Sequence, residues 1–141
     1  MKKYIVKPFF IALTLSLASA SFADYAVIVN PANNANINKE DIARLFLSKV
    51  KKFADGSQAI PINSASGSEI RMTFNTAVAG KNESQMKAYW STLVFTGKGV
   101  PPKEVSSDSE MMDLVGKNPS VIGYVDSNSV NDSVKVVLTF Q

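Results

Sequence analysis

The sequence has neither cysteine nor histidine among its 141 residues. Without cysteine the chain has no disulfide, no thiol nucleophile and no site for a lipid on a cysteine after a leader. Without histidine it also lacks the imidazole base of most nucleophilic enzymes and the usual zinc ligand sets. The acidic residues are scattered and show no calcium-loop spacing. We therefore expect a protein that is not an enzyme and that has no metal site and no cofactor.

The first 23 residues have the pattern of a secretory leader. Lys2, Lys3 and Lys7 form a positive beginning, and the apolar run that follows is too short to span a bilayer. Small residues at Ser21 and Ala23 fit a signal-peptidase site, so we expect cleavage after Ala23. The pattern predicts a periplasmic protein without a membrane anchor. It divides the chain into a signal peptide, 1–23, and a single domain, 24–141.

The basic character of the sequence belongs to this leader. The leader holds three of the 15 Lys and Arg residues and none of the 12 Asp and Glu residues, so residues 24–141 carry twelve of each. Binding to nucleic acid depends on many cations that neutralise phosphates. The formally neutral domain therefore predicts no nucleic-acid partner.

Hydrophobic periodicity in residues 24–141 predicts alternating strands and helices. Strands are expected at 26–29, 59–62, 121–125 and 134–140, and helices after Asn38, at 68–79, after Ser84 and after Ser107. This order predicts an α/β fold with a mainly parallel sheet and helices on both faces. The aromatic faces of these elements predict burial of Phe46, Phe74, Trp90 and Tyr124, and the stripe of the third helix is expected to be core. Gly123, inside a strand, predicts the close approach of another backbone or a ligand.

The turn between the second strand and the second helix is the candidate binding site. It offers the hydroxyl groups of Ser64, Ser66 and Ser68, and Gly67 allows close backbone approach. Arg71 lies in the first turn of the helix. Backbone N–H groups and the positive end of a helix dipole at such a turn bind oxyanions, and an arginine adds a bidentate contact.

A structural interpretation of the same turn stays open. Ser66 and Glu69 fit the capping-box pattern Ser-x-x-Glu, in which the serine hydroxyl serves the helix instead of a ligand. Glu69 also brings a negative charge close to the place that an anion would occupy. Weak binding that a partner completes is a third interpretation, because hydration competes with an open half-site.

Four short motifs resemble the phosphate-type substrate-binding proteins of ABC transporters, the PstS-like family, and their order covers nearly all of residues 24–141. They are the helix at 41–48, the Phe-Ala-Asp-Gly turn at 53–56, Ser66-Gly67-Ser68 followed by Phe74, and Ile-Gly-Tyr-Val at 122–125 after Pro119. The resemblance implies one lobe of the type II periplasmic-binding-protein fold. The family places an arginine shortly before the Ser-Gly-Thr turn, where this chain has Ile62.

Two function hypotheses follow from the resemblance. The first is an exported solute-binding protein for phosphate or a related oxyanion, linked to ABC-type transport, with Ser64, Ser66, Gly67, Ser68 and Arg71 as ligand-binding residues. The second is a single-lobe interaction or accessory module of the envelope that has lost tight ligand binding. The partners implied are the small oxyanion and a transporter permease, a sensor or a second copy of the chain.

Overall fold

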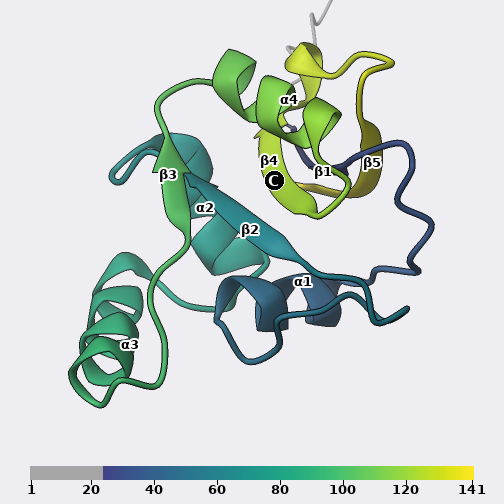
Figure 1. Ribbon diagram of the computed structural model, residues 1–141. Helices are drawn as coiled ribbons and strands as arrows, with labels where there is room; N and C mark the ends of the chain where they lie inside the picture. The colour runs from purple at the N-terminus through teal and green to yellow at the C-terminus, as the bar shows by residue number, and fades with distance from the viewer. Residues whose placement is uncertain (1–23) are drawn as a thin grey trace, which may run out of the picture.

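The structure, a computed structural model, describes residues 24–141, so the expected leader lies outside the described residues. Figure 1 shows a sheet with helices packed against it and one helix, α3, set apart from it. The elements in chain order are β1 Tyr25–Val29, α1 Lys39–Phe46, β2 Ile60–Ser64, α2 Glu69–Ala77, α3 Glu83–Phe95, β3 Lys103–Val105, α4 Asp108–Lys117, β4 Val121–Asp126, the 3₁₀ turn η1 Ser127–Ser129 and β5 Lys135–Phe140.

The sheet is mixed, so the expectation of a mainly parallel sheet is wrong. Its strand order is β3-β2-β4-β1-β5. The β2–β3 and β2–β4 pairs are parallel, whereas β1 is antiparallel to both β4 and β5. The reversed strand β1 lies between β4 and β5 and so makes two of the four pairings antiparallel. Strand direction depends on where the connections lead, and hydrophobic runs do not encode it.

Side chains alternate along each strand, so the apolar strands present side chains on both faces of the sheet. Helices cover both of these faces. On one face, α1 and α2 contribute Phe46 and Phe74 to a core with Val27 and Tyr124. On the other face, Met111 and the rest of the apolar side of α4 pack against the opposite set of strand side chains. Within residues 24–141 no helix has the length and apolar composition needed to cross a membrane.

Aromatic rings dominate the first of these cores. Phe74 stacks on Tyr124 with ring centroids 4.1 Å apart and an interplanar angle of 4°. Phe46 meets the edge of Phe74 at 4.7 Å. The predicted burial of Phe46, Phe74, Trp90 and Tyr124 is confirmed, since all four side chains are at least nine-tenths buried.

Close packing of α4 on β4 explains Gly123. A Cβ at this position would lie 2.2 Å from Sδ of Met111, which is fully buried. The glycine therefore admits a side chain from α4, and the predicted approach of a backbone or a ligand is not what the structure shows. Met111 fills the space that any larger residue in β4 would need.

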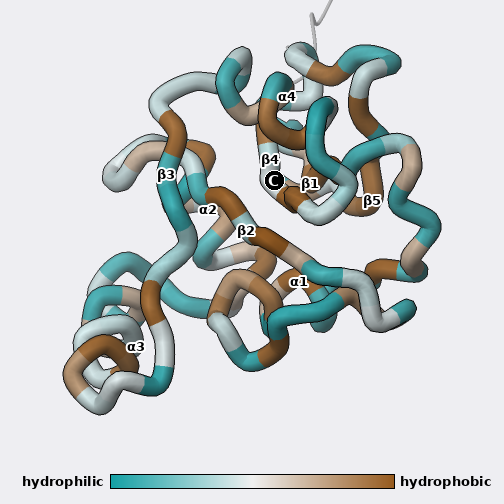
Figure 2. The backbone as a smooth tube through the Cα atoms, viewed as in Figure 1, coloured by the Kyte–Doolittle hydropathy of each residue, from teal (hydrophilic) through white to brown (hydrophobic). Residues whose placement is uncertain are grey.

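Helix α3 departs furthest from the expectation. It begins after Asn82, whose side chain accepts a hydrogen bond from the N–H of Gln85 in a capping box, and not after Ser84. Trp90 is its one buried side chain, so the expectation that the whole stripe is core is wrong. Tyr89 ties the helix to the end of α1 by donating to the carbonyl oxygen of Leu47 at 2.6 Å. Figure 2 shows a hydrophobic stretch on α3 at the edge of the molecule.

Candidate functional site

Hydrogen bonds to the carbonyl oxygen of Ala65 close the turn between β2 and α2. Both the N–H and the hydroxyl of Ser68 donate to the Ala65 carbonyl oxygen, at 3.1 and 2.7 Å. Gly67 has φ +79°, a left-handed conformation that glycine adopts without strain. Ser66 and Gly67 at the tip are exposed. The turn therefore presents its tip outward while Ser68 serves the turn itself.

The capping box expected from Ser66 and Glu69 does not form. Ser68 is the N-cap of α2, and its side chain makes no capping hydrogen bond. Because the helix begins at Glu69, this glutamate lies too early to reach back as the third residue of a capping box would. The N-terminal end of α2 thus lacks a side-chain cap among the described residues, and its dipole faces the tip of the turn.

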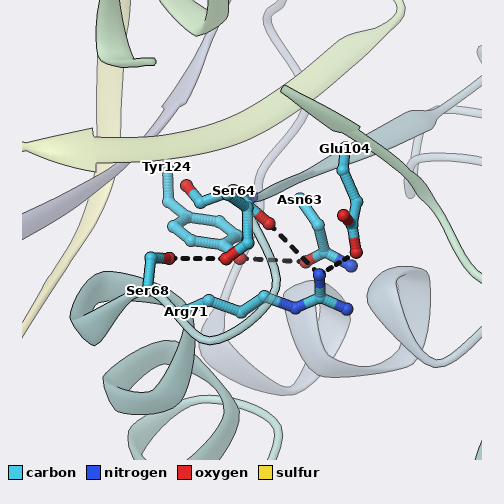
Figure 3. Close-up of polar contacts among 7 residues, drawn as sticks. Asn63, Ser64, Ser68, Arg71, Glu104 and Tyr124 are labelled. Atoms are coloured by element: carbon cyan, nitrogen blue, oxygen red, sulfur yellow. Dashed lines mark hydrogen bonds and ion pairs between the residues drawn. The ribbon is translucent and has the colours of Figure 1, made fainter. Parts of the chain in front are cut away.

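Arg71 folds back from α2 toward the end of β2. Its Nη1 donates to the carbonyl oxygen of Ser64 at 3.2 Å and forms an ion pair with Oε1 of Glu104 (Figure 3). The Arg71 side chain is 16% exposed, compared with 45% for Glu104. The acid that contacts the candidate site is therefore Glu104 and not Glu69.

The sequence did not predict a role for Glu104, because it did not predict strand β3. This strand has three residues and follows the loop with Pro101 and Pro102, so it carries no periodicity that a pattern could detect. Its parallel register with β2 places Glu104 opposite Asn63. Strand pairing thus brings Glu104 beside Arg71, 33 residues away along the chain.

A buried polar network holds the end of β2 in place. The hydroxyl of Tyr124 donates to Oδ1 of Asn63 at 2.9 Å and accepts from the N–H of Ser64 at 3.2 Å (Figure 3). Burial raises the pKa of Tyr124 to about 12, so the hydroxyl keeps its proton at neutral pH. The N–H of Ser64 is bound to Tyr124 and its carbonyl oxygen to Arg71. The backbone of Ser64 therefore fixes the position of the Arg71 side chain.

A groove of about 820 Å³ lies between α2 and α3 and opens beside Arg71. Of the five residues expected to bind a ligand, Ser66, Gly67 and Arg71 line it, whereas Ser64 and Ser68 do not. Most of its wall is apolar and comes from α2, from the stripe of α3 and from the loop before β3. The apolar lining residues are Met72, Met86, Trp90, Val94, Phe95 and Pro101.

Asn75 adds a polar side chain to this groove. The residue is 7% exposed and lines the groove one helical turn after Arg71. Its side-chain amide makes no hydrogen bond with any other residue in the described part of the chain. Among the described residues Ser127 Oγ, and not the Asn75 amide, is the fully buried side-chain atom without a partner, so solvent reaches the Asn75 amide from the groove. An amide left open toward a groove is therefore available to a ligand.

Comparison with solved structures identifies the fold. The chain matches an ABC-type phosphate transport receptor from Vibrio cholerae with a TM-score of 0.62 and 20% identity, over 82% of this chain and 46% of the receptor. It matches a putative phosphate ABC transporter substrate-binding protein with bound phosphate from Clostridium perfringens with a TM-score of 0.63 and 20% identity, over 82% and 45%. The match to PstS from Borrelia burgdorferi has a TM-score of 0.59 and 17% identity, over 82% and 47%.

These matches concern the fold of part of each protein. The chain spans about half the length of the structures that it matches. By sequence, no protein family and no curated protein matches it. The structural neighbours are named as transport receptors and binding proteins and not as enzymes. The chain thus resembles the phosphate-type substrate-binding proteins of ABC transporters, as its motifs predict, and has the fold of about half of such a protein.

Proposed function

We propose that this chain is an exported substrate-binding protein of reduced size, which binds phosphate or a related oxyanion and serves ABC-type transport. In this proposal residues 1–23 are the leader and residues 24–141 form the single binding domain in the periplasm. The names of the structural neighbours support a substrate-binding role. A transporter permease is the proposed protein partner, with a sensor or a second copy of the chain as the other candidates.

One observation carries the proposal: the guanidinium of Arg71 and the uncapped N-terminal end of α2 face the same groove at the glycine turn. An oxyanion there would accept from the backbone at Gly67, from the hydroxyl of Ser66 and from the guanidinium of Arg71. Hydrogen bonds to a charged group are stronger than neutral ones, and an arginine presents two donors to one oxyanion.

Glu104 sets the strength of this site. Its carboxylate is paired with Arg71, so an incoming anion competes with it for the same donors. Like charges this close repel, and an open site leaves the anion largely hydrated. We therefore expect weak affinity for inorganic anions, and we expect the affinity to rise when the charge of Glu104 is removed.

Calorimetric titration of the purified protein with phosphate and with sulfate tests the proposal. Arg71→Ala should weaken binding by roughly 1.5–3 kcal/mol, the range for a hydrogen bond to a charged group. Glu104→Gln should strengthen binding by several-fold, because the competing charge is lost while the shape is kept.

Matched controls are available on α4, away from the groove. Lys117 and Asp113 form an exposed ion pair on this helix. Lys117→Ala and Asp113→Asn repeat the two charge changes and should leave affinity unchanged. If neither phosphate nor sulfate gives heat or shifts the melting temperature at millimolar concentration, the oxyanion proposal is wrong and the turn serves only the fold.

The export part of the proposal has its own test. N-terminal sequencing of the protein recovered from the periplasm of a Gram-negative host should begin at Asp24. A membrane-bound product that keeps residues 1–23 would contradict the proposed leader.

A further inference from the structure

Building on the oxyanion site proposed above, we propose that the groove between α2 and α3 binds an amphipathic organic anion. Its single oxyanion head lies at Arg71, and its apolar body lies along Trp90 and Val94. The proposal names the substrate class of the site. It rests on the size of the groove, on the nature of its wall, on the amide of Asn75 and on the balance of charges around it.

Size is the first argument. Small-molecule sites usually have volumes of about 300–1,000 Å³, and the groove has about 820 Å³. A single tetrahedral oxyanion would occupy only the end beside Arg71 and Gly67. The rest of the groove extends along α3 and has room for an organic body attached to that head.

The wall beyond Arg71 suits an apolar body. Trp90 forms a nearly buried floor at 9% exposure, whereas Val94 is 52% and Phe95 92% exposed. Apolar side chains that gather on one open surface mark a binding surface more often than isolated ones do. Met72 and Met86 add flexible, polarisable side chains that adapt to ligands of different shape.

Asn75 adds a polar group to the groove near Arg71. It lies four residues after Arg71 and thus on the same face of α2. Its unpaired amide can donate to and accept from a polar atom next to the head, such as the ester oxygen of an organic phosphate. An apolar molecule without a polar group would leave this amide unsatisfied, which disfavours a plain hydrocarbon.

The charges that line the groove limit the head to one oxyanion group. Arg71 and Lys87 are balanced by Glu83 and Glu104, so the lining is formally neutral. A di- or triphosphate would bring several negative charges with no excess of cations to meet them. The combination therefore favours one phosphate or carboxylate on an apolar chain or ring.

Titration of the purified protein with octyl phosphate, below the concentration at which it forms micelles, tests this inference. Trp90 is the single tryptophan of the chain and lines the groove, so its fluorescence reports occupancy directly. We expect octyl phosphate to bind at least about tenfold more tightly than inorganic phosphate and to shift the Trp90 emission to shorter wavelength. Octanol, which lacks the head, should bind more weakly than octyl phosphate.

Two matched substitutions separate the groove from general surface effects. Val94→Asn should lower the affinity for octyl phosphate by about fivefold and leave that for inorganic phosphate unchanged. Val136→Asn makes the same change on β5, where Val136 is 41% exposed outside the groove, and should affect neither ligand. Asn75→Leu should weaken the binding of octyl phosphate more than the binding of octanol. The melting temperature of this variant checks that it is folded.

The outcomes distinguish this inference from the oxyanion site itself. Equal affinity for octyl and inorganic phosphate, or equal effects of Val94→Asn and Val136→Asn, would overturn the amphipathic ligand and leave the oxyanion site standing. Failure of both phosphates to bind would overturn both proposals. A dimer in sedimentation that Val94→Asn abolishes, with no binding of octyl phosphate, would assign the groove to a second copy and overturn this inference.

Discussion

The helices that cover the sheet and helix α3 differ in how their apolar residues are arranged and buried. Helices α1, α2 and α4 each place an apolar stripe against the sheet, and all three bury it. Helix α3 is richer in apolar residues, but they are spread around the helix, and Trp90 is its one buried side chain. Apolar spacing along a helix reports which face is apolar, whereas burial requires another surface opposite that face. In this molecule the apolar side chains of α3 that no other element covers form the wall of a groove.

The largest difference between the two regions should appear when one aromatic ring is removed from each. Phe74→Ala should lower the free energy of unfolding by ~3–5 kcal/mol, because the ring is fully buried against Tyr124, Phe46 and Phe140. Phe95→Ala, at a side chain that is 92% exposed, should change it by less than about 0.5 kcal/mol. Urea denaturation of both variants measures this, and similar losses would erase the distinction between the regions.

High pH should lower the free energy of unfolding through Tyr124 in the sheet. The pKa of Tyr124 is raised to about 12 by burial, compared with about 10 in an unfolded chain, so the folded protein keeps this proton longer. The resulting stability is complete below pH 10 and is lost as pH rises toward 12, by about 2–3 kcal/mol in total. Tyr124→Phe, which is less stable at neutral pH, should show a flatter decline between pH 10 and 12. An unchanged slope would mean that Tyr124 is not the responsible group.

Tight packing should also make the sheet intolerant of a single methyl group. Gly123→Ala would place its Cβ against buried Met111 and should cost about 1–3 kcal/mol. Gly116→Ala on α4 is the matched control, because its nearest neighbour, the Ser133 carbonyl oxygen, lies 3.4 Å from the new Cβ. Thermal unfolding of both variants tests this, and a Gly123→Ala protein as stable as wild type would show that Met111 moves freely.

The smallest expected effect concerns the attachment of α3. Tyr89→Phe removes the hydrogen bond to the Leu47 carbonyl oxygen and should cost about 0.5–1.5 kcal/mol. Amide hydrogen exchange should show faster exchange in α3 while β1 and β4 keep their protection. Thr92→Val changes a hydroxyl that bonds only within α3 and serves as the control. Uniform loosening of all elements would show that α3 and the sheet unfold together.

Much of the candidate site was predictable because its parts lie close together in the chain. The order strand, glycine turn, helix and arginine identifies Ser66, Gly67 and Arg71, which the structure brings to one groove. Glu104 and Asn75 were not predictable in the same way. Glu104 reaches Arg71 only through strand pairing, and the burial of Asn75, a polar residue in a helix, follows from no apolar periodicity.

The sequence by itself determined most of the helices and strands and the apolar side of the helices that cover the sheet. Capping by Asn38 and Ser107, the glycine turn and the burial of Phe46 and Phe74 all follow from contacts within a few residues or from helical spacing. Tertiary structure decided the reversed strand β1, the short strand β3, the partner of Arg71 and the open stripe of α3. Local hydrogen bonds and periodicity depend on residues that are close in the sequence. Strand direction and the surface that covers a helix depend on contacts between segments that are far apart in the sequence.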